Sequence, residues 1–200
     1  MTASDLIIGS DGLARPAWAA TTDLLRHYYD TEWGMPVRDE QGLFERLSLE
    51  AFQAGLSWEL VLRKREGFRA AFAGFDPERV AEFGEGDVEK LLENPEIIRN
   101  RRKIEAVIRN ARAVLVLRED GGLVDLIWSH QPAENLAPET LADIPSRSPE
   151  SEALSKALKK AGLTFVGPVM CFALMEAIGM VDTHLLGSHR RGTSGVWGEA

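Results

Sequence analysis

Apolar residues along this chain recur every three or four positions, the spacing that places them on one face of an α-helix. Leu43, Phe44 and Leu47 follow this spacing in a stretch that ends at about Gln53. Stretches in which apolar and polar residues alternate and then meet a hairpin turn are missing from the sequence. The pattern therefore predicts an all-α protein.

Polar caps, prolines and glycines indicate where the predicted helices begin and end. Asp39, Ser57 and Ser148 are suitable N-caps, and Pro77 and Pro168 suit the first position of a helix. Residues 1–20 and 129–149 are predicted to be mostly irregular, and residues 188–200 to form a flexible tail. The predicted helices start near 22 and then cover 39–53, 58–72, 77 onward, 87–93 with Asp87 as the cap, 96–118, 139–142, 149–160 and 168–178.

The composition fits a soluble protein with a substantial core. The 200 residues are 44% hydrophobic and 27% charged, which suits one large domain or two small lobes that share a core. Cys171 is the only cysteine, so an intramolecular disulfide and a cysteine-rich metal site are excluded. The sequence shows neither a secretory signal nor an apolar run long enough to cross a bilayer. We therefore expect a cytoplasmic protein without membrane attachment.

The net charge of −8 argues against a protein that coats nucleic acid without specificity. Local basic faces are still compatible with this total, because a patch matters more than the sum. The candidates are residues 63–65, 99–112 and 156–160. Each of them also fits an ordinary solvated helix face, and the composition does not decide between the two interpretations.

Glu50 lies at the edge of an apolar helical stripe, and aromatic residues are close to it in sequence. Tyr28, Trp33 and Trp58 are its neighbours, and Trp18 also lies in the first third of the chain. A half-buried carboxylate accepts hydrogen bonds, and aromatic rings stack on flat partners. This combination favours a site for a flat, electron-poor ring such as a nucleobase.

Ordinary structural roles explain the same residues. Glu50 can form an exposed ion pair with Arg46 one turn earlier, which contributes about 0.3–0.5 kcal/mol. Tryptophan residues usually belong to the core. Helical periodicity alone leaves both interpretations open.

Residues 158–169, LKKAGLTFVGPV, place the end of one helix and the start of the next within twelve residues. Gly167 allows the backbone to approach a ligand closely. The N–H groups near Phe165 to Gly167 can point at a phosphate, beside the positive end of the following helix. An ordinary helical hairpin explains these residues equally well.

Six segments between about Arg15 and Gly187 are together similar to one protein family, and they occur in the family's order. The segments are YYDTEWG, LEAFQAGLSWELVLRKRE, GFDP, IIRNRRKIEAVIRNA, HQP and LSKALKKAGLTFVGP. They resemble the DNA-3-methyladenine glycosylase I family, a branch of the helix-hairpin-helix glycosylases. The resemblance implies one all-α domain over residues 1–187, with two helical lobes, a base pocket between them and the hairpin at about 158–169.

The resemblance also implies the activity, which is hydrolysis of the N-glycosidic bond of 3-methyladenine in alkylated double-stranded DNA. The damaged base leaves the stack to reach the pocket. By this resemblance, Glu50 accepts hydrogen bonds from the base, and Tyr28 and Trp58 stack against it. Trp18 and Trp33 help to shape the pocket. A monomeric enzyme is expected.

Two further segments are expected to contact DNA by the same resemblance. Gly55 and Leu56 form a turn whose leucine enters the gap left in the duplex, and Phe165, Val166 and Gly167 hold the phosphate backbone. A cationic 3-methyladenine is already a good leaving group, so a strong acid is not required. The residue that activates the water is not identified; Asp182 is the nearest candidate.

The chain departs from the family at the positions that usually hold a zinc ion through two cysteines and two histidines. These positions are occupied by Pro16, Tyr29, His184 and Ser188, of which only His184 can act as a family ligand. We therefore expect no family-type zinc and no other cofactor, with Tyr29 and Trp18 packed where the metal would be.

A rearranged site with His27 and His189 is the remaining metal hypothesis. Two other functions remain as alternatives. One is a glycosylase for another alkylated base, and the other is a module that binds damaged DNA without cutting it.

Overall fold

In the computed structural model, helices begin after the predicted caps Asp39, Ser57 and Ser148. The Asp39 carboxylate accepts a hydrogen bond from the Gly42 amide at 2.7 Å, and the hydroxyls of Ser57 and Ser148 accept hydrogen bonds from amides in the first turns that follow them.

The structure describes residues 5–197. Within that range the α-helices are α1 Asp23–Thr31, α2 Glu40–Gln53, α3 Trp58–Arg63, α4 Arg65–Ala71, α5 Pro77–Ala81, α6 Glu85–Glu93, α7 Arg101–Leu117, α8 Gly122–Trp128, α9 Pro149–Lys160 and α10 Pro168–Ala177.

Short elements complete the described chain. The 3-10 helices are η1 Ala17–Ala20, η2 Ala73–Phe75, η3 Arg118–Asp120 and η4 Leu141–Asp143. Strands β1 Leu6–Ile8 and β2 Ala14–Pro16 pair antiparallel, with Leu6 opposite Pro16. The irregular conformation expected for residues 1–20 is therefore wrong over these strands. Their three-residue length is too short for alternation to be recognised in the sequence.

Several helix boundaries differ from the predictions. The single helix expected at 58–72 is divided at Lys64, whose ψ is 0°. The long helix begins at Arg101, capped by the Asn100 side chain, because the apolar pair Ile97 and Ile98 before it lies outside any helix. Asp87 is not the cap of α6 but lies in its first turn, where it accepts the Gly84 amide. Helix α8 begins at Gly122, the second glycine of the pair, and was not predicted.

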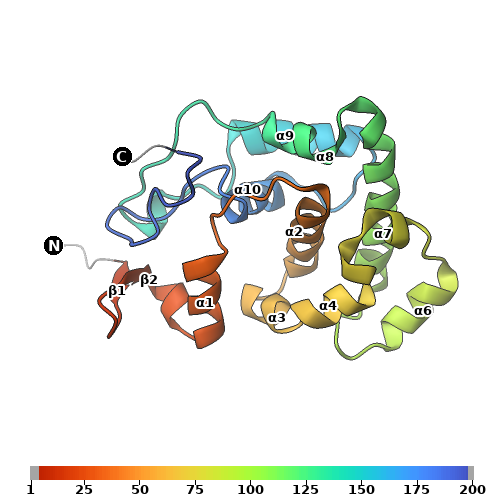
Figure 1. Cartoon of the computed structure of the whole chain (residues 1–200), viewed down its shortest axis with the longest axis horizontal. Coiled ribbons are helices and arrows are strands. Elements are labelled where there is room, and N and C mark those ends of the chain that lie inside the picture. Colours follow the sequence, from red (N-terminus) through yellow and green to blue (C-terminus); the bar gives the residue numbers. More distant parts are fainter. Residues whose placement is uncertain (1–4, 198–200) are drawn as a thin grey trace.

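Helix α2 occupies the centre of the larger lobe. It packs against α3, α7, α8 and α10, and Figure 1 shows it surrounded by these elements. Leu43, Phe44, Leu47 and Phe52 are fully buried on it. Burial of each such side chain contributes about 1.5–3 kcal/mol. The end of α2 that carries Glu50 is therefore held in place by a packed core.

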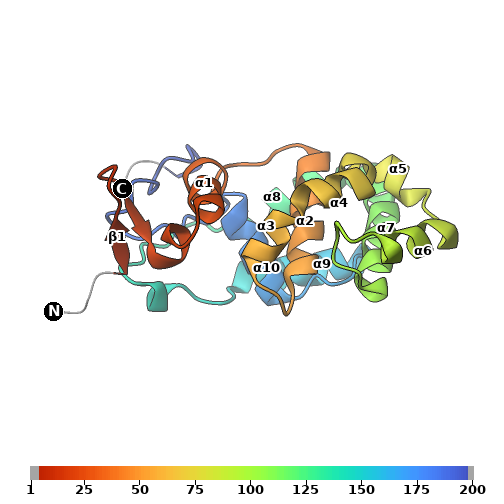
Figure 2. The ribbon, with the colours of Figure 1, turned by 90° about the horizontal axis from the view of Figure 1, so that it is seen from below.

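A smaller lobe contains both ends of the described chain. Strands β1 and β2, helix α1 and the segment after α10 lie together at one end of the molecule in both views (Figures 1 and 2). Arg15 on β2 is buried and binds Asp30 and Asp11 through its guanidinium group. The Leu186 amide donates to the Pro138 carbonyl, which ties the C-terminal segment to the loop before α9.

The segment after Gly187 is docked onto this lobe over much of its length. The hydroxyls of Ser188 and Tyr29 share a hydrogen bond of 2.6 Å, and the Gly192 amide donates a hydrogen bond to the Asp182 carboxylate at 2.8 Å. Residues 188–192 therefore belong to the folded body rather than to the predicted flexible tail. The last predicted tail residues, 198–200, lie outside the described residues.

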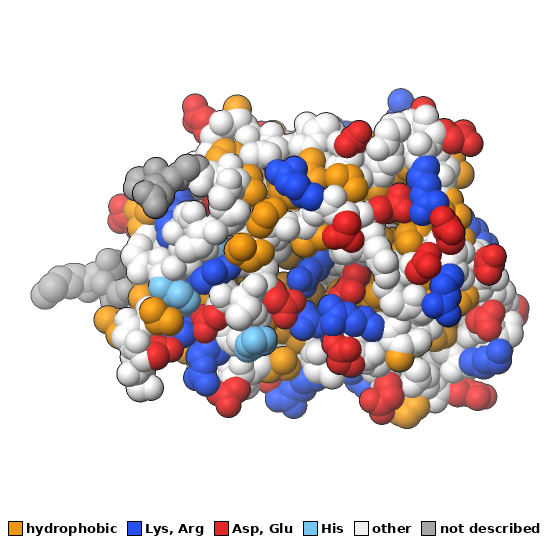
Figure 3. Space-filling model, viewed as in Figure 1, with side chains coloured by type: hydrophobic (Ala, Val, Ile, Leu, Met, Phe, Trp, Pro, Cys, Tyr) orange, Lys and Arg blue, Asp and Glu red, His pale blue; other side chains and the backbone are white. Residues whose placement is uncertain are grey.

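The surface in Figure 3 carries acidic and basic side chains side by side over α4, α5 and α6. Many cations in the predicted basic faces are paired: Arg63 binds Glu59, and Arg101 binds Glu85 and Glu89. Over residues 5–197, no helix is long and apolar enough to span a membrane.

Candidate active site

A cavity of about 280 Å³ lies between the two lobes. The smaller lobe contributes aromatic rings from η1 and from the end of α1. The larger lobe contributes polar and aromatic groups from α2, α3 and α10. The lining residues are Trp18, Tyr28, Trp33, Glu50, Gln53, Trp58, Ile144, Ala173 and Glu176. All five residues predicted to form the base pocket therefore meet in one cavity.

Tyr28 and Trp58 form one aromatic wall. Their ring centres are 5.5 Å apart and the planes are inclined by 49°. The buried Tyr28 hydroxyl and the Trp58 indole N–H have no hydrogen-bond partner among the described residues. Buried polar groups are rarely left unpaired, so these two groups are available to a ligand.

Trp18 and Trp33 form the second wall, in an edge-to-face arrangement with ring centres 5.5 Å apart. The Trp33 ring is in turn supported by the edge of His184 at 4.7 Å. Gly34 makes this approach possible, because a Cβ at that position would lie 2.3 Å from the His184 ring. Its φ of 77° also favours glycine.

The Glu50 side chain enters the cavity from the last turns of α2 and is only 6% exposed. Burial, followed by the nearby Glu176 carboxylate, raises the pKa of Glu50 to about 8, although Arg46 opposes the shift. No described residue donates a hydrogen bond or forms an ion pair with its carboxylate. This carboxylate is free to accept hydrogen bonds from a bound molecule.

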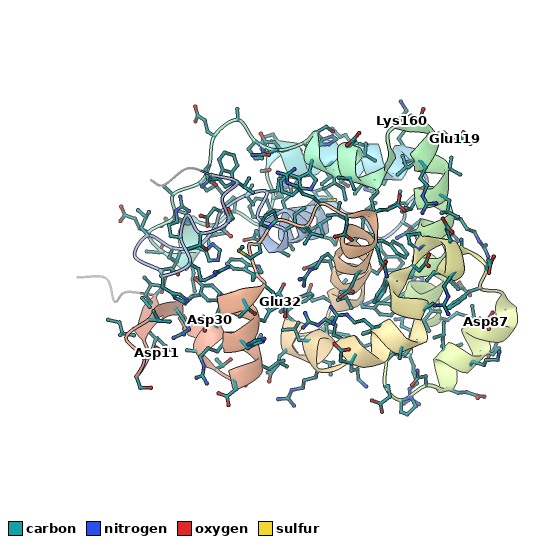
Figure 4. The ribbon with its side chains drawn as sticks, viewed as in Figure 1. Asp11, Asp30, Glu32, Asp87, Glu119 and Lys160 are labelled. Carbon is teal, nitrogen blue, oxygen red and sulfur yellow. The ribbon has the colours of Figure 1, made fainter. Side chains whose placement is uncertain are left out.

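The ion pair between Glu50 and Arg46, which was the alternative interpretation, is not formed. Arg46 instead donates to Glu32 at 3.1 Å, and Arg65 binds both oxygens of Glu32 at 2.6 and 2.9 Å. Glu32 lies between α1 and α2 (Figure 4). Its carboxylate therefore links the two lobes beside the cavity and leaves Glu50 unpaired.

Glu176 is a second carboxylate in the cavity, and sequence reasoning missed it. It comes from α10, and its Oε1 accepts the Thr183 hydroxyl at 2.8 Å. Burial raises the pKa of Glu176 to about 7, despite the opposing hydrogen bond from Thr183. The sequence did contain a clue, because a single acid interrupts an otherwise apolar helix. Gln53, Ile144 and Ala173 were also not predicted.

The predicted DNA-inserting turn directly follows α2, whose last residue, Gln53, lines the cavity. Gly55 has a φ of 82°, and Leu56 is 37% exposed. Lys103 on α7 donates to the carbonyls of Phe52 and Ala54 at 2.9 and 2.7 Å. A cation is favourable at the carboxyl end of a helix, so this lysine fixes the turn that presents Leu56.

The predicted hairpin is held by side chains of the helices around it. Buried Asn110 on α7 accepts the Thr164 amide at 2.8 Å and donates to its carbonyl at 3.0 Å. Ser155 donates to the Val166 carbonyl at 2.6 Å. Val166 is buried, whereas Phe165 is 38% exposed and has a φ of 58°.

Two arginines lie beside the hairpin. Arg102 and Arg109 line a cavity of about 330 Å³ together with Glu105, Thr164 and Phe165, and neither arginine forms an ion pair with a described residue. The amides of residues 165–167 donate to no described residue. Free amides and unpaired guanidinium groups are the groups that bind phosphate.

The four positions that would correspond to family zinc ligands do not fit a zinc ion. The Tyr29 hydroxyl and the Ser188 hydroxyl share a hydrogen bond of 2.6 Å, and burial raises the pKa of Tyr29 to about 12. Pro16 carries no ligand atom. His184 binds Asp182 through Nδ1 at 2.6 Å, and its Nε2 has no hydrogen-bond partner among the described residues, so it alone of the four keeps a suitable ligand atom. Neutral hydroxyls bonded to each other are poor replacements for thiolates.

The predicted aromatic packing occurs at this place. The Tyr29 ring stacks on Trp33 at 5.6 Å and meets the edge of Trp18 at 5.4 Å. In the described part of the chain, no three His, Cys, Asp or Glu side chains gather as a metal ion would require. His189 instead contacts the Ala14 carbonyl and Asp30.

Asp182 does not line the cavity, although it was the nearest candidate for activating water. Burial opposes its ionisation, but hydrogen bonds from His184 and the Gly192 amide lower the pKa of Asp182 overall. The charged carboxylate also accepts the His184 amide at 3.0 Å. These contacts give Asp182 a role in holding the C-terminal segment.

Known proteins are similar to this chain in sequence and fold. A profile of the methyladenine glycosylase family matches residues 18–191. DNA-3-methyladenine glycosylase 1 of Escherichia coli (strain K12) is 48% identical over 179 residues, which is 88% of this chain and 95% of that protein. A crystal structure of 3-methyladenine DNA glycosylase I superposes with a TM-score of 0.84 at 45% identity, covering 88% of this chain and 98% of that one.

A second solved structure contains a bound base. It is a variant of 3-methyladenine DNA glycosylase I in complex with 3-methyladenine, with a TM-score of 0.83 and 33% identity. The alignment covers 88% of this chain and 96% of that chain. The helical fold is therefore shared along nearly the full length of these proteins.

Proposed function

Because the chain belongs to the methyladenine glycosylase family and is a 3-methyladenine DNA glycosylase of base excision repair, we propose that the cavity between its lobes receives the flipped base. The N-glycosidic bond is hydrolysed there. The observation that carries this proposal is the unpaired, buried Glu50 carboxylate between two aromatic walls. Flipping is required because the bond and the base edge are not reachable inside a duplex.

Recognition of the base combines stacking with hydrogen bonding. Tyr28 and Trp58 stack against the base, while Trp18 and Trp33 limit the size of the pocket. Stacking on an aromatic side chain contributes about 1–3 kcal/mol per base. Glu50 accepts hydrogen bonds from the base and stabilises its positive charge, which selects 3-methyladenine over neutral adenine.

Binding to the duplex uses the turn at Gly55 and Leu56 and the hairpin at residues 165–167. Leu56 enters the space that the flipped nucleotide leaves, and Lys103 keeps its turn in place. The amides of residues 165–167 and the neighbouring Arg109 bind the phosphate backbone. The contacts of residues 165–167 and Arg109 are made to the phosphate backbone of the DNA, so they position the enzyme without reading the base sequence.

The chemical step needs little acid catalysis. A 3-methylated adenine in DNA carries a positive charge, so the glycosidic bond breaks without prior protonation of the base. Tight binding of the ground state would not accelerate this step on its own. The pocket must therefore hold the sugar in a strained orientation and admit one water molecule as the bond breaks.

The partner of this enzyme is alkylated double-stranded DNA. We propose that the protein acts as a monomer, because one chain contributes both the pocket and the DNA-binding segments. We also propose that it works in the cytoplasm. The net charge of −8 requires that binding depend on local groups such as Arg102 and Arg109.

Base release from methylated duplex DNA tests this proposal. The wild-type protein should release 3-methyladenine, and Glu50→Gln, which keeps the shape of the side chain but removes its charge, should lose most of the activity. Glu93→Gln is the matched control, because Glu93 is exposed on α6. Equal activity of Glu50→Gln and wild type would show that the assigned role of Glu50 is wrong.

A further inference from the structure

Two carboxylates from two neighbouring helices line the same cavity. Glu50 comes from α2 and Glu176 from α10, and these helices pack against each other in the larger lobe (Figure 1). The proposed recognition of the base uses only one of them. An acid in the interior of a helix is costly to bury unless it has a partner. Glu176 therefore needs an explanation of its own.

The hydrogen bonds within the protein leave Glu176 with unused acceptor capacity. Thr183 is its single hydrogen-bond donor among the described residues, and it reaches only Oε1. An ionised carboxylate has about four acceptor positions. No lysine or arginine among the described residues forms an ion pair with Glu176. Glu176 lines the cavity, as Glu50 does.

We propose that Glu176 is a second substrate-binding carboxylate, which acts with Glu50 to bind the positive charge of the flipped base. This inference rests on the proposed function, because it assumes that the cavity receives a cationic base. The structure supports it through the shared cavity, the burial of Glu50, the half-buried position of Glu176 and the missing counter-ion. A cation that enters the cavity supplies the partner that both carboxylates lack.

The two acids are electrostatically coupled, and this coupling gives a directional test. Burial, and after it the Glu176 charge, raises the pKa of Glu50 to about 8. The pKa of Glu176 is about 7. Such a pair titrates jointly rather than as two independent groups. Binding of a cation favours the charged forms and therefore releases protons from the pair.

Few other charged groups face this pair. Arg46 on α2 lowers the pKa of Glu50, and Tyr28 on α1 faces the same cavity. The residues of α9 that are buried against the core carry no charge; they are Ser151, Leu154, Ser155 and Leu158. In the segment after α10, Asp182 and His184 bind each other. The two carboxylates are therefore the main titratable groups of the cavity.

Glu176→Gln tests the proposal, because the amide keeps the size of the side chain and its bond to Thr183. At pH 8.5 the variant should release 3-methyladenine from methylated duplex DNA with a kcat/KM about tenfold lower than wild type, the loss typical of one hydrogen bond to a charged group. Removal of the Glu176 charge should also lower the pKa of Glu50. The acidic limb of the pH profile should therefore move to lower pH. Glu93→Gln should change neither quantity.

The outcomes separate this inference from the proposed function. If wild type releases no 3-methyladenine, the proposed function fails and this inference fails with it. If wild type is active and Glu176→Gln has the same kcat/KM or an unmoved acidic limb, only this inference is overturned. Should Glu176→Gln fail to fold in a thermal melt, Glu176→Asp replaces it. That variant keeps the charge but retracts it, so kcat/KM should fall, and an unchanged kcat/KM would overturn the proposal.

Discussion

Replacement of Lys103 by methionine should destabilise the protein and displace the turn that carries Leu56. The ammonium group of Lys103 is buried and donates to two carbonyls at the end of α2. Methionine fills most of the same space with an unbranched apolar chain, so the substitution removes the donor and leaves the packing largely intact. The effect therefore reports on these two hydrogen bonds.

Loss of the hydrogen bond at each of the two carbonyls destabilises the protein by a different amount. The Phe52 carbonyl is buried in the bond to Lys103, and an orphaned buried acceptor costs about 1–3 kcal/mol. The Ala54 carbonyl is partly exposed and recovers a hydrogen bond from water, which leaves a loss of about 0.5–1 kcal/mol. The sum is about 3 kcal/mol, which for a chain of this length lowers Tm by roughly 6–12 °C.

Urea denaturation and a base-release assay measure both consequences. Lys103→Met should lower the free energy of unfolding by about 3 kcal/mol and reduce release from duplex DNA more than release from single-stranded DNA. Lys90→Met is the matched control, because Lys90 lies on the surface of α6 and pairs only with exposed Asp87. An unfolding free energy equal to that of wild type would refute the role of Lys103 at the end of α2.

Three further substitutions test the segments around the pocket. Leu56→Ala should reduce release from duplex DNA about tenfold, since a leucine contact is worth about 1.5 kcal/mol, and equal rates on duplex DNA would contradict insertion of Leu56. Asn110→Ala removes the hydrogen bonds that hold Thr164, so the protein should lose about 2–3 kcal/mol of stability in urea and bind duplex DNA more weakly in a filter assay. Tyr29→Phe loses only the bond to Ser188; it should cost about 1 kcal/mol in urea and leave base release within twofold, because the stacked ring stays in place.

The helical fold was largely predictable because helix caps act locally. Asp39, Ser57 and Ser148 each cap the helix that they were expected to cap, since the cap and its amide lie within three residues. Boundaries without a distinctive cap were misplaced. The start of α7 was expected five residues early, because apolar periodicity continues through the turn before Asn100.

The pocket was predicted in part. Glu50 and the four aromatic residues were identified through the resemblance of short segments, and they all line one cavity. Glu176 was missed because it lies far along the chain, and only packing of α10 against α2 brings it to the cavity. Lys103 and Asn110 were missed for the same reason, since both act on backbone groups about fifty residues away.

The positions of the family's zinc ligands show that contacts between distant residues cannot be predicted from short sequence segments. Substitution of the ligand positions was visible in the sequence, and the packing of Tyr29 with Trp18 was expected. The hydrogen bond between Tyr29 and Ser188 joins residues from opposite ends of the chain, so it became apparent only in the fold. Apolar contact and this hydrogen bond now connect the chain ends of the smaller lobe.

A crystal structure of this protein with bound 3-methyladenine tests the central claim most directly. We expect the base in the cavity between Tyr28 and Trp58, with a Glu50 oxygen within hydrogen-bonding distance of a base nitrogen. A base bound elsewhere, or one held in the cavity with Glu50 turned away from it, would show that the proposed pocket is wrong.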